Sequence, residues 1–122
     1  MTTKNTIQGY FDGLKSKSGW HTFLADEMVF NSYAIPPKHV EGKAAYLVAT
    51  KRFFSMISSV TIKDVIVDGD RACALTEYEL QPPGGPAFHS HVAEIFKVRE
   101  TEIVSLDIYF DSTPFPKPPA GA

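Results

Sequence analysis

The sequence contains little of what several classes of protein require. Its 122 residues include one cysteine, Cys73, so no disulfide can form within the chain, and a zinc knuckle, which needs at least two cysteines, is excluded. The net charge is -2, and no basic cluster is longer than the pair Lys51-Arg52. Nucleic-acid binding requires a basic footprint, so we expect no nucleic-acid partner, and no anionic membrane partner either.

Long hydrophobic runs are also missing. No stretch approaches the roughly 20 apolar residues of a membrane span, and the N-terminal segment MTTKNTIQGYFDG lacks the apolar core of a signal peptide. With a single thiol, these features favour a protein of the cytoplasm. Hydrophobic residues make up 43% and charged residues 21%, which is ordinary for a globular chain. The length suits one domain, expected over 1–113.

Hydrophobic periodicity predicts helices in the first half of the chain. Apolar residues recur at helical spacing over residues 3–16, which predicts an amphipathic helix. Ser18 can cap a second short helix over 20–26. Residues 41–57 form the longest candidate helix, and its apolar residues follow two stripes, so we expect it to be buried on more than one side.

Strand patterns dominate the second half. An early strand over 28–35 is rich in Val, Phe, Tyr and Ile and is ended by Pro36-Pro37. Turn residues then separate four further strand-like runs. A proline-rich tail over 114–122 follows, which we expect to be an extension without regular structure. The four runs are 60–67, 71–80, 87–98 and 102–110.

Helices followed by a strand meander indicate an α+β fold. A long curved sheet folded around helices leaves a hollow, which is a natural pocket for a small molecule.

Three local motifs resemble a known superfamily. They are FLADEMVFNSYAIPPKHVEG at 23–42, VAEIFKV followed by EIVSL, and the closing DIYFDSTPF. Their order and spacing resemble the nuclear transport factor two-like superfamily, also called SnoaL-like or cystatin-like. The resemblance implies a curved, mixed, mostly antiparallel sheet wrapped around three N-terminal helices, forming a cone with an internal pocket. Isomerases, dehydratases, epoxide hydrolases, polyketide cyclases and non-enzymatic binders share this fold, so the pocket residues must decide the function.

Comparison with limonene-epoxide-hydrolase-like members argues against their chemistry. Where that group has an Asp-Arg-Asp triad, this chain has Leu75, Glu77 and Ile108. The matching Tyr and Asn positions hold Phe30 and Ser32. Since only one carboxylate is kept, activation of water by that triad is not expected.

Ketosteroid-isomerase-like members offer a second comparison. Tyr10 and Glu94 fall near the positions of their oxyanion hole, while Ser32 stands at the position of their general base. Strand parity, taken from these matches, places Glu77 and Glu94 on the pocket side. If the intervening turn centres near Gly85-Pro86, the two carboxylates face each other with Cβ atoms about 5 Å apart, and if it centres one residue earlier they are diagonal neighbours. One would then keep its proton, which yields an acid and a base.

The same strand parity predicts on which face of the sheet the remaining candidate residues lie. The catalytic candidates are Glu94, Glu77 and Tyr10. His89 and His91 fall on the opposite face, so we expect no metal site, and no phosphate-binding loop or other cofactor motif is present. That outer face is expected to form a homodimer interface. The expected pocket wall consists of Trp20, Phe30, Ser32, Phe54, Leu75, Phe96, Ile108 and Phe110.

Three functions stay open at this point. The first is a cofactor-independent isomerase, cyclase or hydrolase that acts by proton transfer on a small apolar cyclic or carbonyl compound. The second is a ligand-binding or dimerisation domain with the same pocket and no chemistry, since a glutamate on a strand usually faces water. The third is a dehydratase that uses His91, because scytalone-type dehydratases carry a similar His-x-His-x-Ala segment.

Overall fold

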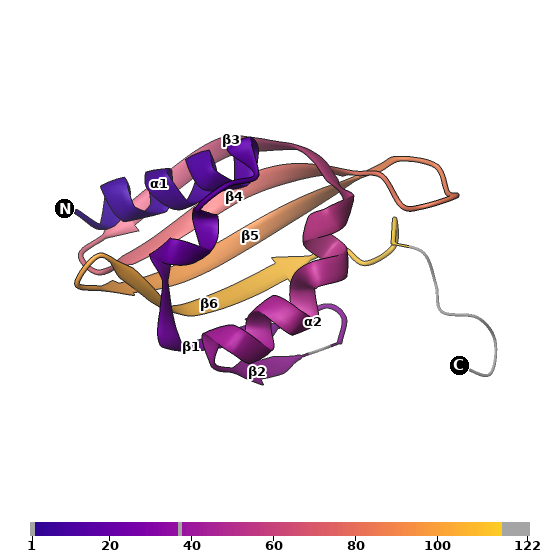
Figure 1. The fold of residues 1–122 in the computed structure, drawn as a ribbon. Coiled ribbons are helices and arrows are strands. Elements are labelled where there is room, and N and C mark those ends of the chain that lie inside the picture. Colours follow the sequence, from indigo (N-terminus) through magenta and orange to yellow (C-terminus); the bar gives the residue numbers. More distant parts are fainter. Residues whose placement is uncertain (1, 37, 116–122) are drawn as a thin grey trace.

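The computed structural model describes residues 2–36 and 38–115, in which two α-helices cover one face of a six-stranded sheet (Figure 1). The first helix, α1, spans Thr3–Ser16 and is capped by Thr2, whose side chain accepts a hydrogen bond from the backbone N–H of Asn5. The second, α2, spans Lys43–Met56. A single 3₁₀ turn, Trp20–Phe23, leads from α1 into the sheet.

The sheet is mostly antiparallel, with strand order β2-β1-β6-β5-β4-β3. Among the pairs described, only β1 and β6 run parallel. The predicted α+β class and the mostly antiparallel sheet are therefore confirmed. The strands are β1 (Leu24–Ser32), β2 (His39–Glu41), β3 (Ile57–Asp68), β4 (Arg71–Leu80), β5 (Phe88–Arg99) and β6 (Glu102–Phe110).

The main core lies between α1 and the inner face of the sheet. Tyr10 and Phe11 of α1 are fully enclosed, and both rings meet Phe96 of β5 edge-on, with centroids 5.7 and 5.9 Å apart. Leu24 and Ala25, at the start of β1, are also fully buried. This packing fixes one end of the sheet, while α2 covers the other end less closely (Figure 1).

The prediction of three N-terminal helices is wrong in detail. The second helix is one 3₁₀ turn, which follows Gly19 at a positive φ of 77°. The turn ends at Phe23 because Leu24 and Ala25 enter β1 and bury their side chains in the core. The short strand β2 was not predicted.

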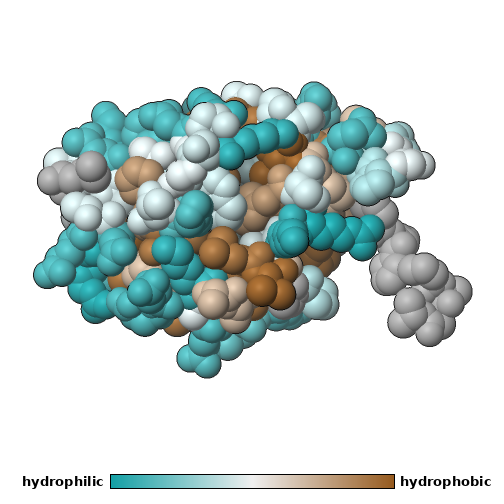
Figure 2. Space-filling model, viewed as in Figure 1, coloured by the Kyte–Doolittle hydropathy of each residue, from teal (hydrophilic) through white to brown (hydrophobic). Residues whose placement is uncertain are grey.

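The expected burial of α2 on more than one side is also wrong. Only Tyr46 of this helix is fully buried, and Val48 is 80% exposed. One side of α2 faces the hollow of the sheet and the other faces outward, so the helix has no second layer to pack against. Figure 2 shows this side of the molecule, where hydrophobic surface gathers over and beside α2.

Two predictions fall partly outside the described residues. Pro37 and residues 116–122 are not described, so the proposed tail is seen only at its start. There, Asp111 accepts hydrogen bonds from the backbone N–H and the hydroxyl of Thr113, and the side chain of Phe115 packs on Phe88 and Phe110. In the described part of the chain, no helix is long and apolar enough to cross a membrane.

Candidate functional site

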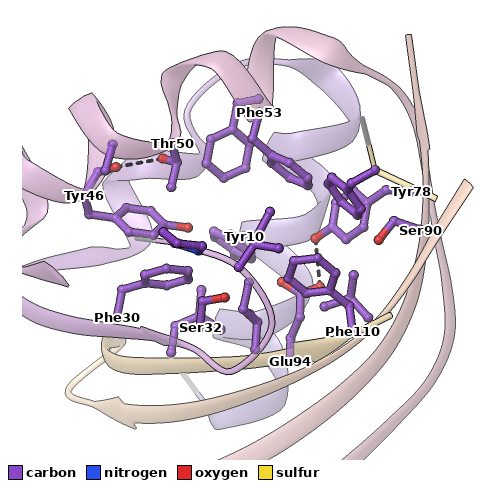
Figure 3. A pocket seen from close by; sticks show the side chains of 18 residues that line it. Tyr10, Phe30, Ser32, Tyr46, Thr50, Phe53, Tyr78, Ser90, Glu94 and Phe110 are labelled. Atoms are coloured by element: carbon purple, nitrogen blue, oxygen red, sulfur yellow. Dashed lines mark hydrogen bonds between the residues drawn. The ribbon is translucent and has the colours of Figure 1, made fainter. Parts of the chain in front are cut away.

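A cavity lies between α2 and the inner face of the sheet (Figure 3). It holds about 750 Å³ of space not filled by atoms, including open solvent at its mouth. Most of its wall is apolar. The apolar lining includes Phe53 and Phe54 of α2, Val92 of β5, and Ile108 and Phe110 of β6.

Glu94 is the one carboxyl group in the wall of this cavity, as far as residues 2–36 and 38–115 show. It is only 4% exposed. Its Oε2 atom accepts two hydrogen bonds of 2.7 Å, from the hydroxyls of Thr76 and Tyr78. Burial raises the pKa of Glu94 to about 7, although both hydrogen bonds favour the carboxylate and lower it. Protonated and charged forms therefore coexist at neutral pH.

Three buried phenols surround this carboxyl group. Tyr10 comes from α1, Tyr46 from α2 and Tyr78 from β4. Burial raises the pKa of all three phenols well above the ordinary tyrosine value of 10. The nearby Glu94 charge acts in the same direction on all three. These phenols stay protonated; Tyr78 already donates to Glu94, which leaves Tyr10 and Tyr46 as phenol donors for an oxygen in the cavity.

The register of β4 and β5 explains how Glu94 fits inside. Its neighbours across the sheet are Ala74 on β4 and Ile108 on β6. Ala74 is small, which leaves room beside it for the carboxyl group. Thr76 and Tyr78 follow on the same face of β4, because alternate residues of a strand point to the same side.

The expected position of Glu77 is wrong. Leu80 pairs with Phe88, so the hairpin loop covers 81–87 and centres on Gly84, not on Gly85-Pro86. Glu77 therefore pairs with His91, on the outer face. A register shift by an odd number of residues moves the whole side-chain set of a strand to the other face.

On that outer face Glu77 makes polar contacts instead of facing Glu94. Its Oε1 lies 2.8 Å from Nδ1 of His89, and its Oε2 lies 3.3 Å from Nζ of Lys63. Both contacts lower the pKa of Glu77, and the contact with His89 has the larger effect. The paired acid and base expected from the sequence do not form.

The predicted pocket wall is placed only in part around the cavity. Phe30, Ser32, Phe54, Ile108 and Phe110 line it. Leu75 shares the outer face with Glu77 and is 41% exposed. Phe96 is enclosed against α1, and Trp20 packs behind Phe54 with ring centroids 4.3 Å apart. Cys73 and Glu79 also lie on the outer face.

Both histidines of β5 lie outside the cavity. His89 contacts Glu77 and also Glu79, whose Oε2 is 3.6 Å from Nε2, and His91 is exposed beside Glu77. Within the described ranges, no group of three or more His, Cys, Asp or Glu side chains is arranged to hold a metal ion. A dehydratase reaction that uses His91 inside the pocket is incompatible with this placement.

Sequence reasoning missed five polar residues of the site. They are Tyr46, Thr50, Thr76, Tyr78 and Ser90. For Thr76 and Tyr78, a signal was present: the other face of β4 carries both glutamates, and charged residues usually face water. That rule places Thr76 and Tyr78 inside.

The comparisons with known proteins agree with this fold. The family model described as a SnoaL-like domain matches residues 7–106. A candidate isomerase from Bacillus subtilis is 22% identical and covers 93% of this chain and 91% of its own, with a TM-score of 0.78. A candidate SnoaL-like polyketide cyclase from Jannaschia sp. CCS1 is 15% identical, covers 95% and 93%, and has a TM-score of 0.77.

A third similar structure comes from Catenulispora acidiphila DSM 44928, a hypothetical protein with a ketosteroid isomerase-like fold, in complex with trimethylamine. It is 20% identical, covers 89% of this chain and 87% of its own, and has a TM-score of 0.74. At these identities the structures support the fold alone. A search among curated proteins found no match to the sequence.

Proposed function

The chain belongs to the SnoaL-like domain family, and we propose that it is a cofactor-independent enzyme of the isomerase or cyclase type. Its substrate would be a small, largely apolar carbonyl compound on which a proton is moved. The observation that carries this proposal is Glu94, a carboxyl group in an apolar cavity whose pKa is raised to about 7 by burial. A group with a pKa near the working pH can both take and give a proton.

The proposed reaction uses Glu94 twice. The carboxylate takes a proton from the carbon next to the carbonyl group, and the C–H electron pair becomes part of an enolate. The negative charge then rests on the substrate oxygen, where a phenol such as Tyr10 donates a hydrogen bond. Protonated Glu94 delivers this proton to another carbon, which completes the isomerisation, or trades it for a solvent proton and then protonates the same carbon, which completes the exchange.

Thr76 and Tyr78 would hold Glu94 in place for these steps. Both donate to Oε2, so neither uses Oε1, and the carboxyl group is fixed in one orientation. We assign them as positioning residues. Tyr10 can bind the substrate oxygen because it lines the cavity and lies near enough to Glu94 for that charge to raise its pKa; Tyr46 meets the same conditions.

Deuterium exchange into 2-tetralone, an apolar cyclic ketone, tests the proposal. In D₂O we expect the wild-type chain to accelerate the replacement of hydrogen by deuterium at the carbons next to the carbonyl group. NMR measures the rate of this exchange. Glu94→Gln should lower the enzymatic rate by about 10²- to 10⁴-fold, the usual contribution of a general acid or base. Glu77→Gln, on the outer face, is the matched control and should keep the wild-type rate.

The same experiment addresses a non-catalytic binding domain. A binding function without catalysis is favoured because the described cavity residues include no second carboxyl group and no histidine. A binder would shift the NMR signals of Glu94 and the tyrosines on adding 2-tetralone, without faster exchange. This outcome would contradict the enzyme proposal.

We further propose that the chain forms a homodimer in the cytoplasm through its outer sheet face. Tyr33 and Tyr109 stack there with ring centroids 4.6 Å apart, and both are exposed together with Leu75 and Ile66. An apolar group of this kind on a sheet face is typical of an interface. A monomer mass by light scattering for the wild-type chain would refute this assembly.

A further inference from the structure

Ser90 is a buried polar residue that the proposed reaction does not use. It lies on the inner face of β5, lines the cavity and is only 1% exposed. Among the residues that the structure describes, its Oγ atom is the one buried side-chain oxygen or nitrogen without a hydrogen-bond partner. Buried hydroxyls are normally paired, so an unpaired one in a cavity wall indicates a partner that enters the cavity, either a water molecule or a polar atom of a ligand.

Ser90 and Glu94 lie on the same face of one strand, with Val92 between them. At about 3.3 Å per residue, their Cα atoms are about 13 Å apart. Tyr78 pairs with Ser90 in register, and its hydroxyl reaches Glu94, so its ring spans much of this distance (Figure 3). The wall is therefore polar at both ends and apolar in the middle, where Val92 lies opposite Phe110.

Aromatic rings enclose the Ser90 end. Phe88 lies two residues before Ser90 on the same face of β5, and Phe110 lies opposite Val92. Phe115 contacts both rings, each with a centroid distance of 5.0 Å. Because apolar rings offer no hydrogen bond, the Ser90 hydroxyl can gain a partner only from a molecule that enters from the cavity.

We propose that Ser90 is a second anchor of the ligand, and that the ligand is an elongated apolar compound with an oxygen at each end. Its carbonyl oxygen lies at Glu94 and Tyr10, its apolar body lies along Val92 and Phe110, and its far hydroxyl or carbonyl oxygen bonds to Ser90. This inference rests on the proposed function, because it takes the Glu94 end as the reactive end. It adds a determinant of specificity at the other end.

Two related ketones test the inference, namely 2-tetralone and 6-hydroxy-2-tetralone, which carries a second oxygen on the ring far from the carbonyl group. We expect the wild-type chain to bind the hydroxylated ketone about tenfold more tightly in calorimetry, the contribution of a good hydrogen bond. Ser90→Ala should remove this preference and leave the affinity for 2-tetralone unchanged. Val92→Ala is the control and should weaken both ketones alike.

Stability gives a second readout that does not depend on a ligand. Ser90→Ala removes an unpaired buried hydroxyl, so its Tm should equal or exceed that of the wild type. A clear fall in Tm would mean that the hydroxyl already has a partner in the free protein, and would overturn the inference. Ser90→Cys nearly keeps the side-chain volume and has only a weak donor, so it should also lose the preference for the hydroxylated ketone, which separates the lost hydrogen bond from a change in packing.

The two proposals fail differently. If the wild type binds both ketones with equal affinity, or if Ser90→Ala keeps the preference, the second anchor is wrong and the proton chemistry at Glu94 stands. If the wild type binds neither ketone and exchanges no deuterium, the proposed function fails and the anchor fails with it.

Discussion

Replacing Glu94 by glutamine should change how the stability of the protein depends on pH. The folded chain raises the pKa of this carboxyl group to about 7, while its ordinary value is 4.5. A glutamate with a raised pKa contributes its full stability below about pH 4.5, and this contribution is lost as the pH rises through about 7. The wild-type chain should therefore lose stability over this interval, and Glu94→Gln, which cannot ionise, should not.

The magnitude follows from the same two pKa values. Their difference corresponds to about 3 kcal/mol of unfolding free energy between the two plateaus. Part of the change is already complete at pH 5, so about 2 to 3 kcal/mol should remain between pH 5 and about pH 8.5. This is a large share of the stability of a domain of this size.

Urea unfolding at several pH values measures the effect. We expect the free energy of Glu94→Gln minus that of the wild type to rise by about 2 to 3 kcal/mol from pH 5 to about pH 8.5. Glu77→Gln is the control, since Glu77 is on the outer face and its pKa is lowered. Parallel pH curves for Glu94→Gln and the wild type would refute the reasoning, because burial would then not disfavour the charged form of Glu94.

Three further predictions follow from single contacts. Tyr78→Phe removes a hydrogen bond that favours the Glu94 carboxylate, so the pKa of Glu94 should rise further, which carboxyl NMR would detect; an unchanged pKa would contradict this role. Glu77→Gln should not lower the pKa of any cavity residue and should leave the rate of deuterium exchange unchanged. A loss of exchange would contradict the placement of Glu77 on the outer face. Gly13→Ala should lower Tm although alanine favours helix by about 1 kcal/mol, because its Cβ would lie 2.7 Å from the backbone N of Trp20; a higher Tm would contradict that close approach.

The phase of β4 shows why the site could be predicted only in part. Its two faces read Ala-Ala-Thr-Tyr-Leu and Cys-Leu-Glu-Glu after the first residue, and both are partly apolar. The loop sequence Pro-Pro-Gly-Gly-Pro permits several turn centres, so the register with β5 is open in the sequence. The alignment to known families favoured the wrong register, although charge alternation favoured the correct one.

The helices show a different limit. The apolar spacing of 3–16 predicts α1 with the bounds that the structure has, because this helix packs on the main core along one stripe. In α2 the same apolar residue types do not indicate a packed core, because Phe53 and Phe54 line a cavity and Val48 is exposed. A sequence pattern indicates which residues avoid water, but it does not distinguish a packed core from the wall of a hollow.

The number of ionisable groups in the cavity restricts the reaction. Hydrolysis and dehydration generally use one group to take a proton and another to protonate the leaving group, whereas isomerisation can use one group for both steps in succession. Of the cavity residues described, Glu94 alone has a pKa near neutrality. The pKa values of Tyr10, Tyr46 and Tyr78 are raised, so these phenols do not ionise at neutral pH. This favours isomerisation or enolisation over the other reactions of the family.

The shape of the pH–rate profile follows from that single group. Deuterium exchange into 2-tetralone needs the Glu94 carboxylate first, so the rate should rise through about pH 7 and then remain level at higher pH. Tyr78→Phe should move the midpoint to higher pH, because the lost hydrogen bond favoured the carboxylate. A bell-shaped profile would require a second titrating group in the mechanism, and the assignment of both proton transfers to Glu94 would then be wrong.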